Sequence, residues 1–235
     1  GAECGRARRR CRRDRLLVGE AGRAWRLRRA HDIAVAVAER VGGDEPSFIK
    51  MMNQKADELG MTRTHFINPH GLPAIRQVTT ARDMALLSRA LLRDFPEHAH
   101  LYSETEAEIA KRKIGTHNAL LRTFDGGDGI KTGYTCASGY NLAASATRGD
   151  LKMVAIIFGG RTSGDRNRRA AALLEHGFRT FEWKSLHPIA RIENLPRENV
   201  GGGFEPDARM LKRFRVCKGP PPEVVKKNAT YKKKA

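Results

Sequence analysis

The chain has 235 residues, of which 40% are hydrophobic and 6% aromatic, and this suffices for one domain with an ordinary core. Its net charge of +18 is typical of nucleic-acid-binding proteins, but residues 30–182 carry twenty basic and eighteen acidic side chains. The basicity therefore lies in the flanks, and we expect the folded part to bind no nucleic acid. No apolar run reaches the roughly 18 residues that a membrane-spanning helix needs, so no membrane span is expected.

The two flanks differ from the middle in composition. Residues 1–29 carry eleven Arg and lack a stable period, which fits a solvated basic arm, an arm for nucleic acid or membranes, or an out-of-frame reading of a GC-rich gene. Residues 183–235 are rich in Pro, Gly and Lys, which predicts a disordered tail. The sequence thus divides into a basic arm (1–29), a folded domain (30–182) and a basic tail (183–235).

The cysteines give no sign of a metal site or a disulfide framework. Their spacing contains neither a C-x-x-C pair nor a zinc pattern; they are Cys4, Cys11, Cys136 and Cys217. A disulfide framework is not expected in a chain of this length. We predict no metal and no cofactor.

Periodicity and turn residues predict an alternation of helices and strands along the domain. Helices are expected at 33–41 with Asp32 as N-cap, at 46–59, at 81–93 with Thr80 as N-cap, near 96–101 and at 164–181. A loop is expected at 61–78, a weak strand within 104–114, a connector at 116–121, and strands at 129–135, 140–147 and 151–158. The residues of the helix at 81–93 that are expected to face the core are Met84, Leu87, Leu91, Ala85 and Ala90.

The most informative motif is Lys131-Thr132-Gly133, at the predicted strand that precedes two further apolar strands. Lysine supplies a positive charge, threonine a hydrogen bond, and glycine the space for a ligand backbone to approach. This trio suits the recognition of a peptide that ends in a carboxylate. K-T-G is one of three motifs of penicillin-binding proteins and serine β-lactamases.

Several stretches together resemble the D-alanyl-D-alanine carboxypeptidases, the low-molecular-mass penicillin-binding proteins. They are Ala30–Pro73, Thr79–Leu92, His117-Asn118, Asp128–Asn141 and Val154–Gly160. The likeness covers about residues 30–181. It implies an α/β fold of the β-lactamase and penicillin-binding-protein type, in which an antiparallel sheet is flanked by helices. The fold would be incomplete at the N-terminus.

The resemblance also implies a mechanism. A serine from an S-x-x-K helix attacks the carbonyl between two terminal D-alanines, its lysine accepts the proton, and water later hydrolyses the acyl-enzyme. An S-x-N motif shuttles protons, and Lys131 of K-T-G would bind the terminal carboxylate. The backbone N–H of Tyr134 would complete an oxyanion hole.

Two of the three motifs have no intact counterpart in this sequence. The S-x-N position falls on Arg29-Ala30-His31, where Arg29 replaces the serine and His31 the asparagine. Residues 1–28 contain no serine, so the nucleophile and its lysine have no match. Ser47-Phe-Ile-Lys50 fits S-x-x-K but lies after the S-x-N position, and we interpret it as a chance match. The chain therefore resembles an N-terminally truncated or frame-shifted member.

Other residues with chemical potential have simpler interpretations. His65 and His70 flank a turn and are expected to serve the loop rather than a metal. Cys136 is expected to be a small buried or edge residue rather than a nucleophile. Arg166, Arg168 and Arg169 are expected on a solvated helix face.

The resemblance implies a serine-type carboxypeptidase that trims peptidoglycan stem peptides ending in D-Ala-D-Ala. It also implies that β-lactams acylate intact relatives of this chain. We expect this chain to be inactive or nearly so. The alternatives are a non-catalytic peptidoglycan-binding remnant or, less favoured, nucleic-acid binding by the flanks. A periplasmic or cell-envelope location is implied by the family, although no export signal is visible.

Overall fold

The computed structural model describes residues 31–109, 112–136, 138–184 and Ile192. Its elements in chain order are α3 (His31–Gly42), α4 (Glu45–Glu58), α5 (Ala81–Asp94), the 3₁₀ turn η1 (Pro96–His98), α6 (His100–Ser103), β1 (Glu106–Ile109), β2 (Arg112–Gly115), α7 (Leu120–Thr123), β3 (Gly127–Thr135), β4 (Gly139–Arg148), β5 (Leu151–Gly160) and α8 (Ser163–Lys184). The predicted helices and strands are confirmed to within a few residues. The segment at 104–114 forms a hairpin, β1 with β2, rather than one strand.

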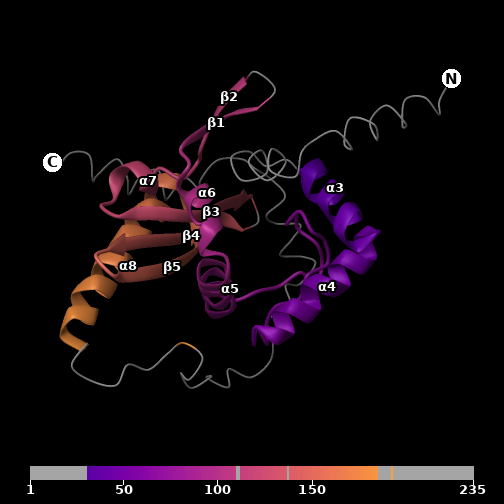
Figure 1. Ribbon diagram of the computed structural model, residues 1–235, viewed down its shortest axis with the longest axis horizontal. Coiled ribbons are helices and arrows are strands. Elements are labelled where there is room, and N and C mark those ends of the chain that lie inside the picture. Colours follow the sequence, from indigo (N-terminus) through magenta and orange to yellow (C-terminus); the bar gives the residue numbers. More distant parts are fainter. Residues whose placement is uncertain (1–30, 110–111, 137, 185–191, 193–235) are drawn as a thin grey trace.

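An antiparallel sheet in the order β3-β4-β5 is the centre of one half of the described structure. Arg148 pairs with Leu151, so a two-residue turn joins β4 to β5. This confirms the predicted hairpin. The other half consists of α3 and α4, which pack against each other (Figure 1). Helix α5 lies between the halves, in contact with β5. This arrangement confirms the α/β fold class.

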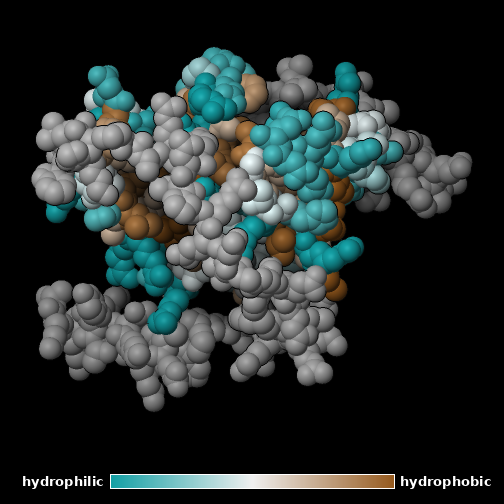
Figure 2. Space-filling model, turned by 90° about the horizontal axis from the view of Figure 1, so that it is seen from below, coloured by the Kyte–Doolittle hydropathy of each residue, from teal (hydrophilic) through white to brown (hydrophobic). Residues whose placement is uncertain are grey.

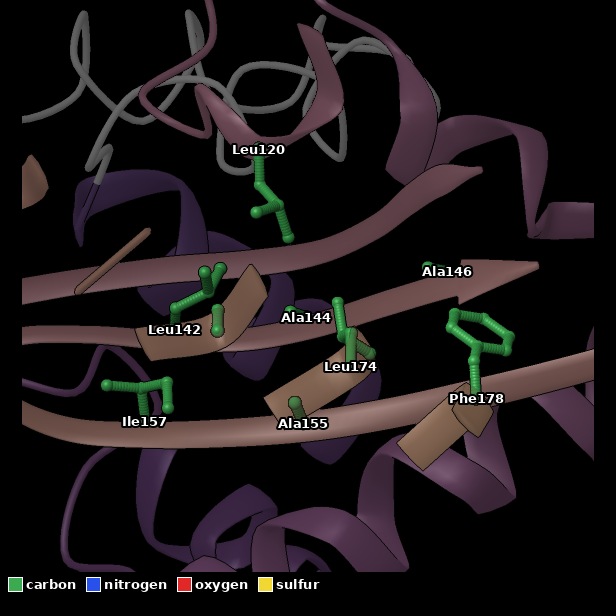
Figure 3. Close-up of a cluster of buried hydrophobic side chains, with 9 residues drawn as sticks. Leu120, Leu142, Ala144, Ala146, Ala155, Ile157, Leu174 and Phe178 are labelled. Atoms are coloured by element: carbon green, nitrogen blue, oxygen red, sulfur yellow. The ribbon is translucent and has the colours of Figure 1, made fainter. Parts of the chain in front are cut away.

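The main core lies between the sheet and α8 (Figure 3). Alternate residues of β4 and β5 face α8, whose contributing side chains recur every four residues. The buried residues are Leu120, Leu142, Ala144, Ala146, Ala155, Ile157, Ala170, Leu174 and Phe178. The small side chains on the strands let the helix approach the sheet closely.

Replacing Leu174 with alanine should destabilise the protein by about 2–5 kcal/mol, because it removes a large side chain that is 1% exposed and leaves a cavity. The neighbouring Leu173 is 50% exposed, so Leu173→Ala is the matched control and should change stability by less than about 1 kcal/mol. Urea denaturation followed by circular dichroism measures both. Equal losses in the two variants would contradict the packing described above.

A second, smaller core joins α4 and α5. It contains Ala56, Met61 and Leu86 as its buried members. Helix α5 begins at the predicted cap, where the Thr80 side chain accepts a hydrogen bond from the Asp83 backbone N–H. Of the residues predicted to face inward in α5, Ala90 is buried but Met84, Leu87 and Leu91 are only partly buried. Leu86 and Ser88, which were not predicted, are buried. Since α5 contacts both the sheet and the small core, more than one of its faces is covered.

The loop at 61–78 is held by buried polar side chains. Asp83 is 2% exposed, and its Oδ2 accepts from the Arg63 N–H at 2.9 Å and the Thr64 hydroxyl at 2.8 Å. Asn53 bonds both the N–H and the carbonyl of Phe66. These bonds satisfy loop backbone groups that neither helix nor sheet would satisfy.

Two predicted details of the ends are different in the structure. Helix α3 already includes His31, so Asp32 lies in its first turn and is not the N-cap. Ile192, within the predicted tail, packs against the small core, and its carbonyl accepts from Arg82 Nη2 at 2.6 Å. The basic arm at 1–29 and the rest of the tail from 185 onward lie outside the described residues.

The surface mixes polar and apolar areas, and brown apolar patches lie among teal ones on the face shown in Figure 2. The large hydrophobic side chains exposed by more than a third are Val41, Met51, Leu72, Ile75, Phe95, Phe158 and Leu173. None of the described helices combines the length and apolar character needed to cross a bilayer.

Candidate active site

The K-T-G residues lie in the middle of β3, with Lys131 opposite Ala143, Thr132 opposite Leu142 and Gly133 opposite Asn141. Among the described residues, β3 has only β4 as a neighbour in its sheet. Successive side chains of a strand alternate between faces, and Leu142 belongs to the core under α8. Thr132 therefore faces the α8 side, and Lys131 the opposite side.

Two hollows lie along β3. Lys131 and Thr132 line the smaller one, of about 10 Å³, which has room for no more than a water molecule. The larger one, of about 350 Å³, has a volume within the usual range for small-ligand sites. Its lining includes Thr132, Gly133, Tyr134, Tyr140, Ser163 and Arg166. Thr132 borders both hollows, whereas Lys131 lines the smaller one.

Arg166, in the first turns of α8, supplies a buried cation at the larger hollow. It is 2% exposed, and its Nη2 donates to the His117 carbonyl at 3.1 Å and to Asn167 Oδ1 at 2.9 Å. Within the described part of the chain, no carboxylate forms an ion pair with it. Burial lowers the pKa of the Arg166 guanidinium, and Tyr140 partly opposes this effect. An arginine nevertheless stays charged at neutral pH, so the hollow presents a cation to an anionic ligand.

The position of Arg166 corrects the prediction that it lies on a solvated face. Arg168 and Arg169 are exposed, as expected. Arg166, however, lies four residues before Ala170, at the start of the buried row that continues to Leu174 and Phe178. The same periodicity that predicted the core face of α8 could have identified it.

The close contact between Gly160, the last residue of β5, and Arg166 leaves no space between them. A Cβ added at Gly160 would lie 2.9 Å from Arg166 Cβ and 3.0 Å from the Tyr140 carbonyl oxygen. Real Cβ atoms essentially never approach other atoms so closely. Glycine at this position is therefore required for α8 to begin directly against the end of the sheet.

Asn118 anchors β3 just before the lysine. Its Nδ2 donates to the Gly129 carbonyl at 3.2 Å, and the residue is 4% exposed. Because Nδ2 must be the donor here, Oδ1 is the remaining acceptor, and this buried atom has no hydrogen-bond partner among the described residues. Gly129 must lack a side chain, since a Cβ there would lie 3.1 Å from Tyr102 Cβ of α6. Sequence reasoning noted Asn118 only as part of the resemblance and assigned it no role.

Two tyrosines and a cysteine follow the K-T-G trio. The rings of Tyr134 and Tyr140 have centroids 4.3 Å apart, and the Tyr134 hydroxyl lies 3.8 Å from Cys136 Sγ. Cys136 is disulfide-bonded, although the spacing of the cysteines in the sequence gave no sign of a pair. The bond agrees with the prediction that Cys136 is not a nucleophile, because a sulfur held in a disulfide is no thiolate.

The residues at the degenerate S-x-N position are only partly described, since Arg29 lies outside the described residues. His31 begins α3, where its Nδ1 lies 3.3 Å from the His70 carbonyl oxygen and its ring meets that of His70 edge to face at 5.7 Å. His65 pairs through its backbone with Val78. These histidines thus serve the loop at 61–78.

Ser47 and Lys50 are both exposed on α4, and the Ser47 N–H donates to the N-cap side chain of Asp44 at 2.7 Å. A serine in this position serves the start of a helix. Among the residues that the structure describes, the Ser47 hydroxyl takes part in no hydrogen bond to a base, so the interpretation of S-x-x-K as a chance match stays a prediction.

The family model for D-alanyl-D-alanine carboxypeptidase matches residues 7–162. The chain belongs to the D-alanyl-D-alanine carboxypeptidase family. The match begins upstream of residue 30, where the resemblance noted in the sequence began. It includes the whole of β3 and therefore Lys131, Thr132 and Gly133.

Named carboxypeptidases and penicillin-binding proteins are similar to the chain. D-alanyl-D-alanine carboxypeptidase DacC of Escherichia coli is 40% identical over 198 residues, which cover 84% of this chain and 49% of that protein. Penicillin-binding protein 5 of Haemophilus influenzae has a TM-score of 0.66 and 35% identity, covering 70% of this chain and 48% of that one. Penicillin-binding protein D2 of Listeria monocytogenes, in its ampicillin-bound form, has a TM-score of 0.65 and 32% identity over 69% and 68% of the two chains.

The chain spans about half the length of the curated carboxypeptidases that it matches. The fold is nevertheless that of the penicillin-binding proteins, because the structural likeness extends over the sheet-and-helix part described above.

Proposed function

We propose that this chain recognises peptidoglycan stem peptides ending in D-Ala-D-Ala, and that β3 and the first turns of α8 form the binding site. Lys131, Thr132, Gly133 and Tyr134 are the proposed contacts on the strand. Arg166 is an addition that the sequence did not suggest. One observation carries the proposal. A K-T-G strand borders a hollow of about 350 Å³ that is also lined by a buried arginine, with which no carboxylate of the described residues forms an ion pair.

Each proposed contact has a chemical reason. The terminal carboxylate needs a cation, and either Lys131 or, on the α8 side of β3, Arg166 can form a charge-assisted hydrogen bond with it. Gly133 leaves room for the peptide backbone beside the strand, since nothing lies closer than 3.7 Å to a Cβ built there. The Tyr134 N–H is the proposed oxyanion-hole donor of an intact relative.

We further propose that this chain binds the peptide but forms no acyl-enzyme. Residues 1–28 provide no serine, and Arg29 and His31 replace the two polar members of S-x-N. A cation binds a carboxylate without any nucleophile, so binding can persist where catalysis does not. A location in the cell envelope follows from the family, and the disulfide at Cys136 supports it because disulfides persist in oxidising compartments.

Isothermal titration of a synthetic tripeptide ending in D-Ala-D-Ala tests this proposal. We expect binding by the wild-type chain, weaker binding of the L-Ala-L-Ala peptide, and at least a roughly tenfold loss of affinity in Lys131→Met, because a charge-assisted bond is removed. Lys113 is an exposed lysine on β2, so Lys113→Met is the matched control and should bind normally. Equal affinity for the two peptides, or full affinity in Lys131→Met, would overturn the proposal.

A further inference from the structure

The N-terminal part of β3 contains a β-bulge at Asp128. Gly127 pairs with Ala146, and Gly129 pairs with the adjacent Ser145, so Asp128 is an extra residue without a partner on β4. A bulge changes which side chains of a strand face which side, because two residues on one strand oppose one on the other. The bulge therefore sets the pairing register of the later residues of β3 with β4, including that of Lys131.

The Asp128 carboxylate is bound by side chains of β4 and β5. Its Oδ1 accepts from the Ser145 hydroxyl at 2.5 Å, and its Oδ2 accepts from the Thr147 hydroxyl at 2.5 Å. Lys152 Nζ of β5 lies 2.9 Å from Oδ2. Ser145 is fully buried, so its hydroxyl depends on this carboxylate for a partner. Three groups from two strands thus hold one bulged residue.

The contacts of Asp128 stabilise the negative charge of its carboxylate. Its partial burial acts to raise the pKa of the carboxyl, but the hydrogen bonds from Ser145 and Thr147 and the ammonium of Lys152 outweigh it, so the pKa is lowered. The group is therefore ionised at neutral pH. As an anion it accepts all three contacts at once.

The rest of β3 specifies its own register poorly. Gly127, Gly129 and Gly133 supply no side chains, and Ile130 is the only residue of the strand among the buried hydrophobics. Glycine-rich strands are prone to slippage, and a slip of one residue moves every side chain to the other face. Such a slip would exchange the faces of Lys131 and Thr132.

We propose that Asp128 is a positioning residue for ligand recognition, because it locks the bulge and thereby keeps Lys131 and Thr132 on their respective faces of the sheet. The proposal rests on the proposed function for the role of Lys131. The register lock itself can be measured without a ligand.

The test compares Asp128→Asn and Asp128→Ala with Asp125→Asn in the full chain. The amide of Asp128→Asn keeps the size of the carboxylate but replaces one acceptor oxygen with a donor and removes the negative charge, so at least one hydrogen bond and the ion pair with Lys152 are lost. Asp125 lies three residues earlier, and its side chain is 90% exposed, which makes it a matched control. Amide hydrogen exchange by NMR reports the register, because the protected N–H groups of β3 are those bonded to β4.

We expect both Asp128 variants to exchange their β3 amides at least about tenfold faster, or in a shifted pattern, while the pairing of β4 with β5 stays protected. Affinity for the D-Ala-D-Ala tripeptide, measured where every variant is fully folded, should fall at least about tenfold in both. Asp125→Asn should match the wild type in both measurements. The retained β4–β5 protection separates a register effect from general unfolding.

If the amides of β3 exchange in both Asp128 variants as they do in the wild type, Asp128 does not fix the register of the strand. Changed exchange with unchanged affinity would overturn the positioning role. Absence of tripeptide binding by the wild type would instead refute the proposed function, and the exchange pattern would still decide the register claim.

Discussion

A protein of these 235 residues will gain no mass when it is incubated with benzylpenicillin. Acylation requires an activated serine, and the S-x-x-K motif has no counterpart in residues 1–28. Ser47 is exposed at the start of α4 and is not a substitute. Loss of a serine nucleophile costs on the order of 10⁶ in turnover in a serine hydrolase, which places any residual reaction below detection on the scale of hours.

Intact-protein mass spectrometry measures this directly. Penicillin-binding protein D2 of Listeria monocytogenes, which has been solved in an ampicillin-bound form, is a suitable positive control. Ser47→Ala is the matched variant and should behave as the wild type does. A stable adduct of one penicillin on any serine, mapped by peptide digestion, would show that a nucleophile exists after all.

Replacing Arg166 with methionine will have opposite effects on binding and on stability. Affinity for the D-Ala-D-Ala tripeptide should fall by about 10- to 100-fold, because hydrogen bonds to charged groups contribute about 1.5–3 kcal/mol. The free energy of unfolding should stay the same or rise, since burying a cation without an acid partner costs more than burying an apolar side chain of similar length. Methionine preserves the aliphatic stem beside Gly160.

Arg169→Met is the control for this change, because Arg169 lies on the same helix but is exposed. It should alter neither quantity by more than experimental error. Titration calorimetry and urea denaturation of the three proteins separate the two effects. A large loss of stability in Arg166→Met with normal affinity would assign Arg166 to the structure alone.

The sheet could be predicted from the sequence because its signals are local. Apolar runs of strand length follow K-T-G, and Arg148-Gly149-Asp150 suits a two-residue turn, so the order and pairing of β3, β4 and β5 follow directly. The N-cap at Thr80 could also be predicted from the sequence. Each of these features depends on residues that are close together in the chain.

Features that depend on distant segments were missed or misjudged. Helix α5 contacts the sheet as well as the small core, and one apolar stripe could not indicate Leu86 and Ser88 as buried. Arg166 was interpreted as part of a charge cluster, although its spacing to Ala170 and Leu174 places it in the buried row. The disulfide at Cys136 joins sulfurs whose proximity no spacing rule could establish.

The tight contact between Gly160 and Arg166 bears on how a ligand would be received. The Cβ of the arginine has no space to shift toward the sheet, and its Nη2 is already occupied by the His117 carbonyl and Asn167. Most of the rotational freedom of this long side chain is therefore lost during folding, before any anion arrives. An incoming carboxylate meets a preorganised partner, so little entropy remains to be lost when the complex forms.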